Sequence, residues 1–286
     1  MSHSYTHFVN EFVRLLDETR DIPLGGLPPV PSPRVQDNAP RALILAPHPD
    51  DECVTGALAL RLRRELHYRV TAVAVTLGSQ VDRQIARLEE MRLAAHFLGT
   101  EVIATRPNGL AGVNLRTREN NPEAWAEMVE VVAGIIAYHR ASVLFMPHDQ
   151  DFNSTHVGTH HLVVDAMKTL GPAFRCKVVE TEFWRPMADP NLMIESSPAD
   201  VADLVAAVSF HQGEVARNPF HLTLPAWMAD NVRRGSELVG GQGAASMGGH
   251  FATLYRIREW TKGGFVPCLN APRFFPAGPG LAPLFL

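Results

Sequence analysis

The chain has 286 residues, of which 46% are apolar, so it can bury a large core in one α/β domain with extensions. Its net charge of −4 lacks the basic balance typical of proteins that bind nucleic acids or membrane surfaces, so neither partner is expected. Its apolar runs are shorter than the roughly 20 residues that cross a bilayer, its three cysteines are scattered, and the N-terminus lacks a signal-peptide pattern, so we expect a cytoplasmic protein.

Residues 1–40 are expected to form an N-terminal helix over 4–19 with one apolar face and a proline-rich connector over 22–40. From residue 41, apolar strand-length runs alternate with helical patterns. The predicted strands are 42–46, 70–76, 101–104, 142–146 and 177–183; the predicted helices are 52–66, 81–98, 122–139, 155–170 and 198–215. Because the strands lack polar alternation, this core over 41–217 predicts an α/β fold: a Rossmann-like, doubly wound, mostly parallel sheet with helices on both faces.

Residues 218–286 are expected to be a C-terminal extension that completes the domain. A strand is predicted over 251–260, and the proline-rich tail from 263 is expected to be irregular coil or to mediate oligomer contacts. The glycine-rich loop 240–249 is a candidate lid. It lacks a preceding strand and a following Lys-Ser/Thr, which disfavours a phosphate-binding loop.

Two polar clusters directly follow predicted strands. The first is His48-Pro49-Asp50-Asp51-Glu52, after the first strand; the second runs from His148 to His156, after the fourth. Ligands of open parallel sheets bind at the carboxyl ends of the strands, so we expect the clusters to lie on one rim. The first cluster also occupies the position after the first strand at which a dinucleotide-binding enzyme has Gly-x-Gly-x-x-Gly. Its sequence therefore disfavours that class of enzyme.

Histidine and carboxylate ligands with one open position are typical of a catalytic zinc site. His48 and Asp51 can chelate one ion from a tight turn, and His156 is the preferred third ligand, with His160 as the alternative. Asp50 lies beside them as a general base for a metal-activated water.

Simpler interpretations exist for each residue. Asp50 and Asp51 are also residue types favoured at helix N-termini. Glu52 is expected to orient its neighbours rather than to bind metal. Arg87 lies on an Arg- and Glu-rich helix, and such residues usually form a solvated, salt-bridged face. His148 is expected near the rim of the sheet, where it either lines the site or has a structural role.

The stretch Ala46 to Glu52 resembles the first motif of the LmbE-like, or PIG-L, family of zinc-dependent N-deacetylases, of the form His-Pro-Asp-Asp-Glu. The resemblance covers roughly residues 41–215. It implies a Rossmann-like fold, His48 and Asp51 as zinc ligands, and Asp50 as base. It also implies His156 as third ligand, because the second motif, usually His-x-Asp-His, aligns with residues 153–156.

The second motif departs from the family pattern at two positions: Asn153 stands in place of His, and Thr155 in place of Asp. The usual His helps to protonate the leaving amine or to hold the oxyanion. His148, His160, His211 or Asp50 itself therefore remain candidates for the general acid. Asn153 stays a weak candidate for contact with the oxyanion or the substrate. Arg87 lies on a helix that resembles a third family feature, and it is a weak candidate for binding a substrate hydroxyl or phosphate.

The resulting hypothesis is an enzyme with one Zn²⁺ per chain that hydrolyses an N-acyl group. The resemblance implies an N-acetylated amino sugar or glycoconjugate as the small-molecule substrate. The alternatives are a non-sugar amide or thiol conjugate as substrate, or a catalytically impaired metal-binding module. The family resemblance also allows a homo-oligomer, with the two chain extensions as the interface.

Overall fold

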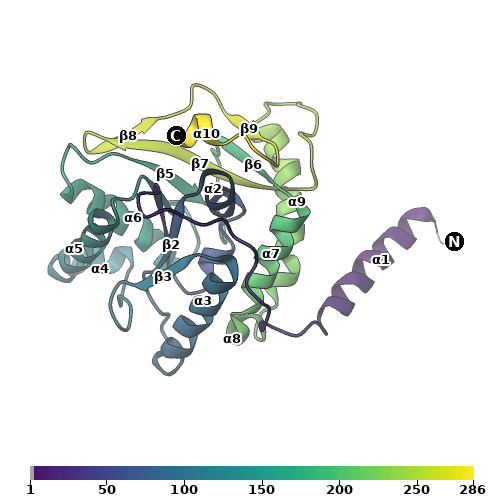
Figure 1. Cartoon of the computed structure of the whole chain (residues 1–286), viewed down its shortest axis with the longest axis horizontal. Helices are drawn as coiled ribbons and strands as arrows, with labels where there is room; N and C mark the ends of the chain where they lie inside the picture. Colours follow the sequence, from purple (N-terminus) through teal and green to yellow (C-terminus); the bar gives the residue numbers. More distant parts are fainter. Residues whose placement is uncertain (1–2) are drawn as a thin grey trace.

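A computed structural model describes residues 3–286; the first two residues of the expected N-terminal segment lie outside the described residues. Within this range one mixed sheet runs in the order β3-β2-β1-β4-β5-β7-β6-β9, with β8 paired to β7 (Figure 1). The strands are β1 Arg41–Ala46, β2 Arg69–Ala74, β3 Glu101–Ala104, β4 Val143–Pro147, β5 Cys176–Thr181, β6 Leu192–Ser196, β7 Phe251–Thr261, β8 Gly264–Pro267 and β9 Arg273–Phe275.

The first five strands are parallel, which confirms the predicted mostly parallel, Rossmann-like sheet. Ala42 of β1 pairs with Val70 of β2 on one side and with Val143 of β4 on the other. The chain order therefore reverses between β1 and β4. Their carboxyl ends lie side by side at this switch point, where open α/β sheets bind ligands.

Helices cover both faces of the sheet. Those over the described residues are α1 Ser4–Thr19, α2 Leu58–Leu66, α3 Gln84–Leu98, α4 Leu115–Asn120, α5 Pro122–His139, α6 Ser154–Thr169, α7 Pro198–Ser209, α8 Gln212–Val215, α9 Phe220–Leu238 and α10 Ala282–Phe285. Apolar side chains of α5 and α6 pack with Leu43, Leu45 and Leu144 on one face. On the other, α2 and α10 pack with Ala42 and Ile44, and α3 and α7 form an adjoining core.

Three predicted helices begin or divide differently in the structure. The helix expected over 52–66 is a 3₁₀ turn, Asp51–Cys53, followed by α2 from Leu58, and the helix expected over 81–98 begins with a 3₁₀ turn before α3. The helix expected over 198–215 is divided into α7 and α8 at Phe210 and His211. The breaks before α2 and at His211 coincide with hydrogen bonds to distant segments, from Tyr255 to Thr55 and between His211 and Glu52, which a local pattern cannot reveal.

The C-terminal third is more regular than the sequence indicates. Strand β7, predicted over 251–260, inserts antiparallel between β5 and β6. The short helix α4, strand β6 and the long helix α9 were not predicted. The expectation of irregular coil from residue 263 is wrong, because the tail forms β8, β9 and α10 and buries Leu281, Leu284 and Phe285.

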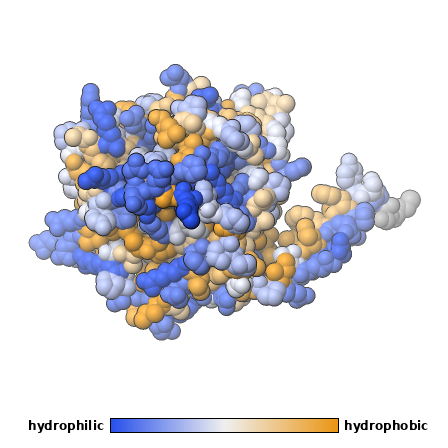
Figure 2. Space-filling model, viewed as in Figure 1, coloured by the Kyte–Doolittle hydropathy of each residue, from blue (hydrophilic) through white to orange (hydrophobic). Residues whose placement is uncertain are grey.

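Helix α1 projects from the body and shows an apolar stripe to solvent (Figures 1 and 2). Its bounds match the predicted helix, and Phe8 and Phe12 are exposed on it. The connector after it runs extended, and the backbone N–H of Val30 donates to the carbonyl of Phe97. No helix of the described residues is long and apolar enough to cross a membrane.

Candidate metal centre

The segment after β1 makes a strained turn before α2. Asp50 has φ 114° and ψ −33°, a conformation that residues other than glycine rarely adopt, and the 3₁₀ turn Asp51–Cys53 follows. The backbone N–H of His48 donates to Asp51 Oδ2 over 2.9 Å. The turn thereby brings the side chains of residues 48 and 51 to the same side.

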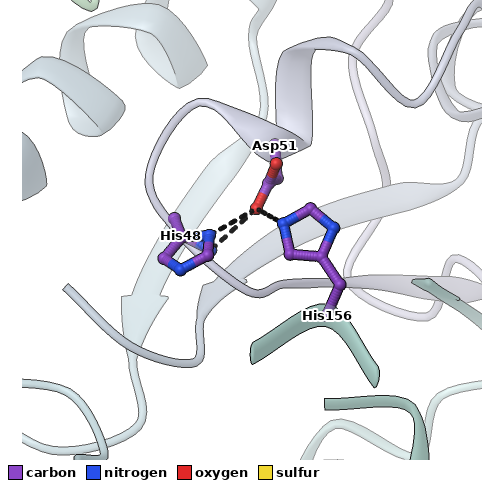
Figure 3. Close-up of side chains that lie close together, drawn as sticks. All are labelled: His48, Asp51 and His156. Carbon is purple, nitrogen blue, oxygen red and sulfur yellow. Dashed lines mark hydrogen bonds and ion pairs between the residues drawn. The ribbon is translucent and has the colours of Figure 1, made fainter. Parts of the chain in front are cut away.

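His48, Asp51 and His156 converge at the switch point between β1 and β4 (Figure 3). Asp51 Oδ2 lies 3.2 Å from His48 Nδ1 and 3.3 Å from His156 Nε2. The donor atoms of the three residues all lie within 4.8 Å of one another. The structure therefore brings together the first cluster and the start of α6, as the topology predicts.

The donor set fits a metal ion. His156 is fully buried, yet neither of its ring nitrogens has a hydrogen-bond partner among residues 3–286. A buried polar atom left without a partner is unfavourable unless another group, such as an ion, completes it. Two imidazoles and one carboxylate are ligands typical of zinc and of other divalent transition metals. Beyond the three donors, Asp151 Oδ1 lies 3.7 Å from His156 Nδ1 and can orient the ring.

Electrostatics set the two adjacent aspartates apart. Burial alone would raise the pKa of Asp51, but the imidazoles of His156 and His48 outweigh it and hold that pKa far below its usual range. Burial and the charge of Asp51 instead raise the pKa of Asp50, against the lowering effect of His211 and Arg87. Asp51 thus stays ionised, while Asp50 binds a proton more readily.

Asp50 faces a cavity of about 390 Å³ that also opens onto the three converging residues. Its carboxylate Oδ2 lies 3.5 Å from Arg87 Nη2, which also donates to the carbonyl of Pro49. Arg87 therefore lines the cavity, as Asn153 does. The Asn153 side chain also caps α6 by accepting the N–H of Thr155.

An apolar wall stands opposite these polar groups, lined by Phe183, Trp184, Phe220, Leu224 and Trp227. The wall comes from the segment after β5 and from α9, and no sequence motif links either of them to the site. The aromatic residues around the unpredicted helix α9 were the available signal. They could be placed at the cavity only once α9 was known to pack beside the rim.

The structure leaves His148 and His160 outside the lining of the cavity. His148 is buried, with Nε2 2.8 Å from the carbonyl of Arg185, and its Nδ1 accepts the N–H of Gln150. His160 Nδ1 lies 3.0 Å from the carbonyl of Pro147. The ring of His148 thus connects the loops after β4 and β5, whereas the ring of His160 connects α6 to the end of β4.

Glu52 and His211 form a buried pair behind the turn. Glu52 Oε2 accepts the N–H of Asp50 over 2.9 Å, and Glu52 Oε1 lies 2.8 Å from His211 Nε2. The sequence pattern favours a surface role for His211, on a continuous helix. The structure instead buries it completely at the break between α7 and α8.

Comparison with known families gives one match. Residues 43–167 match the family model described as PIG-L, GlcNAc-PI de-N-acetylase. The matched range contains His48, Asp50, Asp51 and His156. No curated protein matches the sequence.

Solved structures share the fold at low identity. A deacetylase of the teicoplanin biosynthesis pathway has 14% identity and a TM-score of 0.56, covering 77% of this chain and 98% of its own. The N,N'-diacetylchitobiose deacetylase from Pyrococcus horikoshii has 13% identity and a TM-score of 0.54, and the match covers 90% of this chain and 93% of the deacetylase chain. The 4-carboxy-2-hydroxymuconate hydratase GalB from Pseudomonas putida KT2440 has 15% identity and a TM-score of 0.56, covering 76% and 95%. Because the last catalyses a different reaction, likeness of fold alone does not fix the chemistry.

Proposed function

Residues 43–167 match the PIG-L family model, and on that premise we propose that the chain is a zinc-dependent N-deacetylase. The single observation that carries the proposal is the convergence of the donor atoms of His48, Asp51 and His156, in which the buried ring of His156 makes no hydrogen bond and can therefore bind an ion. The substrate would be an N-acetylated amino sugar or glycoconjugate, in keeping with the family description.

In this proposal His48 Nδ1, Asp51 Oδ2 and His156 Nε2 hold the ion. When bound, zinc supplies a charge that acidifies water and polarises an amide carbonyl. Asp51 suits this role because its depressed pKa keeps it ionised. Asp151 would keep the ring of His156 oriented from behind.

Asp50 takes the proton from the attacking water, since its carboxylate borders the cavity beside the ligand residues. Asn153 cannot donate a proton as the usual family histidine does. His148 and His160 do not line the cavity, and His211 lies behind Glu52. We therefore propose that Asp50 also returns the proton to the leaving amine, with Asn153 and Arg87 beside it as hydrogen-bond donors.

A second candidate keeps the same reaction but changes the substrate to a non-sugar amide or a conjugate. The observation in its favour is the wall of Phe183, Trp184 and Trp227 across the cavity. Such a surface suits an apolar group on the substrate. A substrate panel should therefore include N-acetylated sugars, aryl conjugates of those sugars and simple N-acyl amides.

The first prediction separates metal binding from catalysis. We expect about one zinc ion per purified wild-type chain, a large loss of zinc in His48→Ala, and full zinc in Asp50→Asn. Asp50→Asn should release amine from the panel substrates at least about 100-fold more slowly, because the base is lost. The measurements are elemental metal analysis and an amine-release assay.

His96→Ala is the matched control, because His96 is an exposed histidine of α3 away from the cavity. It should keep both zinc and activity. Full zinc occupancy in His48→Ala would refute the ligand assignment. Amine release by Asp50→Asn at the wild-type rate would remove the assigned base.

A further inference from the structure

The backbone at Asp50 needs support from its surroundings. Its φ of 114° is unfavourable for a residue with a side chain, and such a conformation persists only where neighbouring groups enforce it. The conformation matters for chemistry because it sets the direction of the Asp50 carboxylate and starts the turn that carries Asp51. Whatever holds the backbone of Asp50 therefore holds the base.

Glu52 supplies the direct support. Its Oε2 accepts the N–H of Asp50 over 2.9 Å, and the Cys53 N–H closes the turn onto the carbonyl of Asp50 over 3.1 Å. The Glu52 side chain is almost fully buried. A buried carboxylate acts as a rigid acceptor only if its other oxygen is also satisfied.

His211 satisfies that second oxygen. Its Nε2 lies 2.8 Å from Glu52 Oε1, and the ring is fully buried. His211 reaches the turn from the break between α7 and α8, 159 residues further along the chain. The N–H groups of Glu214 and Val215 donate to its carbonyl, so the same break also starts α8.

A second connection runs from α8 to the side chain of Asp50. Glu214 Oε1 lies 2.9 Å from Arg83 Nη1 and 3.7 Å from Arg87 Nε, and Arg87 Nη2 lies 3.5 Å from Asp50 Oδ2. The segment 211–214 is thus connected to Asp50 indirectly at two points: to the backbone through Glu52, and to the carboxylate through Arg87.

We propose that His211 is a positioning residue of the deacetylase reaction, which acts through Glu52 to hold the Asp50 backbone in its catalytic conformation. The inference rests on the proposed function, because the base it positions belongs to the same site. His211 itself does not line the cavity and does not touch the substrate.

The cluster of Glu52, Cys53 and His211 also resembles a group of metal ligands. The contacts within it favour hydrogen bonding. The Nε2–Oε1 distance of 2.8 Å is that of a hydrogen bond, and the Cys53 thiol lies 3.3 Å from the same oxygen. A thiol beside a carboxylate stays protonated, and a protonated thiol is a poor ligand. Metal analysis decides between the two interpretations.

The test compares His211→Leu, which removes the donor, with His211→Gln, whose amide N–H can still reach Glu52. We expect His211→Leu to lower kcat for amine release roughly 10- to 100-fold with KM nearly unchanged, because the base is misplaced while substrate contacts persist. His211→Gln should recover most of the loss. Zinc should stay at the wild-type level in both variants.

His221→Leu is the control, since it replaces another buried histidine, on α9, that does not contact the turn. It should keep kcat near the wild-type value. Should His211→Leu fail to fold, His211→Asn replaces it, because its shorter amide does not reach Glu52. A double variant with Glu52→Gln tests the connection: its loss should be no larger than that of the worse single variant.

Equal losses in the Leu and Gln variants would assign His211 a purely structural role and overturn the proposal. Additive losses with Glu52→Gln would do the same. Two metal ions per wild-type chain, with one lost in His211→Leu, would make the cluster a metal site instead. Absence of any wild-type amine release would contradict the proposed function, whereas wild-type turnover matched by His211→Leu would contradict only this inference.

Discussion

Asp165 shows how a single side chain fixes the helix that carries His156. Its carboxylate accepts two hydrogen bonds from Arg118 of α4, one from Trp125 of α5 and one from Lys168. It therefore ties α6 to both neighbouring helices on that face of the sheet. Burial opposes ionisation of Asp165, but these donors lower its pKa from 3.8 to about 2.

The depressed pKa predicts how stability depends on pH. Because the folded-state pKa lies below the unfolded value, the ionised Asp165 stabilises the fold above about pH 4, and this contribution is lost as the pH falls towards 2. Asp165→Asn should lower the free energy of unfolding by ~1 kcal/mol at pH 7, after allowance for solvent screening. Urea unfolding at pH 7, 5, 4 and 3 should show the difference between variant and wild type shrinking below pH 4. A difference independent of pH would contradict the assignment.

At the scale of elements, the break before α2 is enforced from a distant strand. Tyr255 of β7 donates its hydroxyl proton to the carbonyl of Thr55 over 2.7 Å, and the Tyr255 hydroxyl oxygen accepts the N–H of Leu58 over 3.4 Å. Gly56 lies between them at φ +81°, where a Cβ atom would overlap the side chains of Thr253 and Tyr255. The absence of a Cβ atom at Gly56 therefore leaves room for the side chains of β7 between the turn Asp51–Cys53 and α2.

Gly56→Ala should destabilise the protein more than Gly171→Ala does. The two glycines share a φ of +81°, but a Cβ atom at Gly171 would meet nothing within 4 Å. We expect Gly171→Ala to cost about 1 kcal/mol from backbone strain, and Gly56→Ala about 1–3 kcal/mol more from overpacking. Equal unfolding free energies of the two variants in urea would show that space at Gly56 is not limiting.

Sequence patterns predicted the elements that depend on local order and missed those that depend on distant contacts. The helices over 4–19 and 122–139 were predicted with their observed bounds, because apolar spacing and an N-terminal proline mark them. The grouping of the residues from His48 to Glu52 could be predicted because they are consecutive in the sequence and lie in one short turn. The position of His211 could not be predicted, because the helix break that directs its side chain toward Glu52 depends on contacts between segments 159 residues apart.

On the scale of the whole molecule, the two ends of the chain differ although both looked like extensions in the sequence. Among the described residues, α1 buries no side chain. The C-terminal helix α10 contributes Leu284 and Phe285 to the core around β1, and the hydroxyl of Tyr68 donates to the carbonyl of Phe285. The last residues are therefore part of the folded body, whereas α1 stands apart from it.

Two deletions test this difference. Removing residues 3–19 should leave the urea midpoint unchanged, since no buried surface is lost. Removing residues 281–286 should lower the free energy of unfolding by on the order of 5 kcal/mol, because three buried apolar side chains are lost. A large loss on removal of residues 3–19 would show that α1 packs against the protein in solution.

The two sides of the cavity come from separate stretches of the chain. His48, Asp50, Asp51, Arg87, Asn153 and His156 lie within residues 43–167, whereas the opposite wall, from Glu182 to Trp227, lies wholly after that range. If the proposed function holds, substitutions of Phe183, Trp184 or Trp227 change which substrate is accepted and leave the residues of 43–167 as they are. An evolving lineage, or an engineer, can therefore alter selectivity through this wall, provided that His211 and Glu214 in the same stretch keep their contacts with the Asp50 turn.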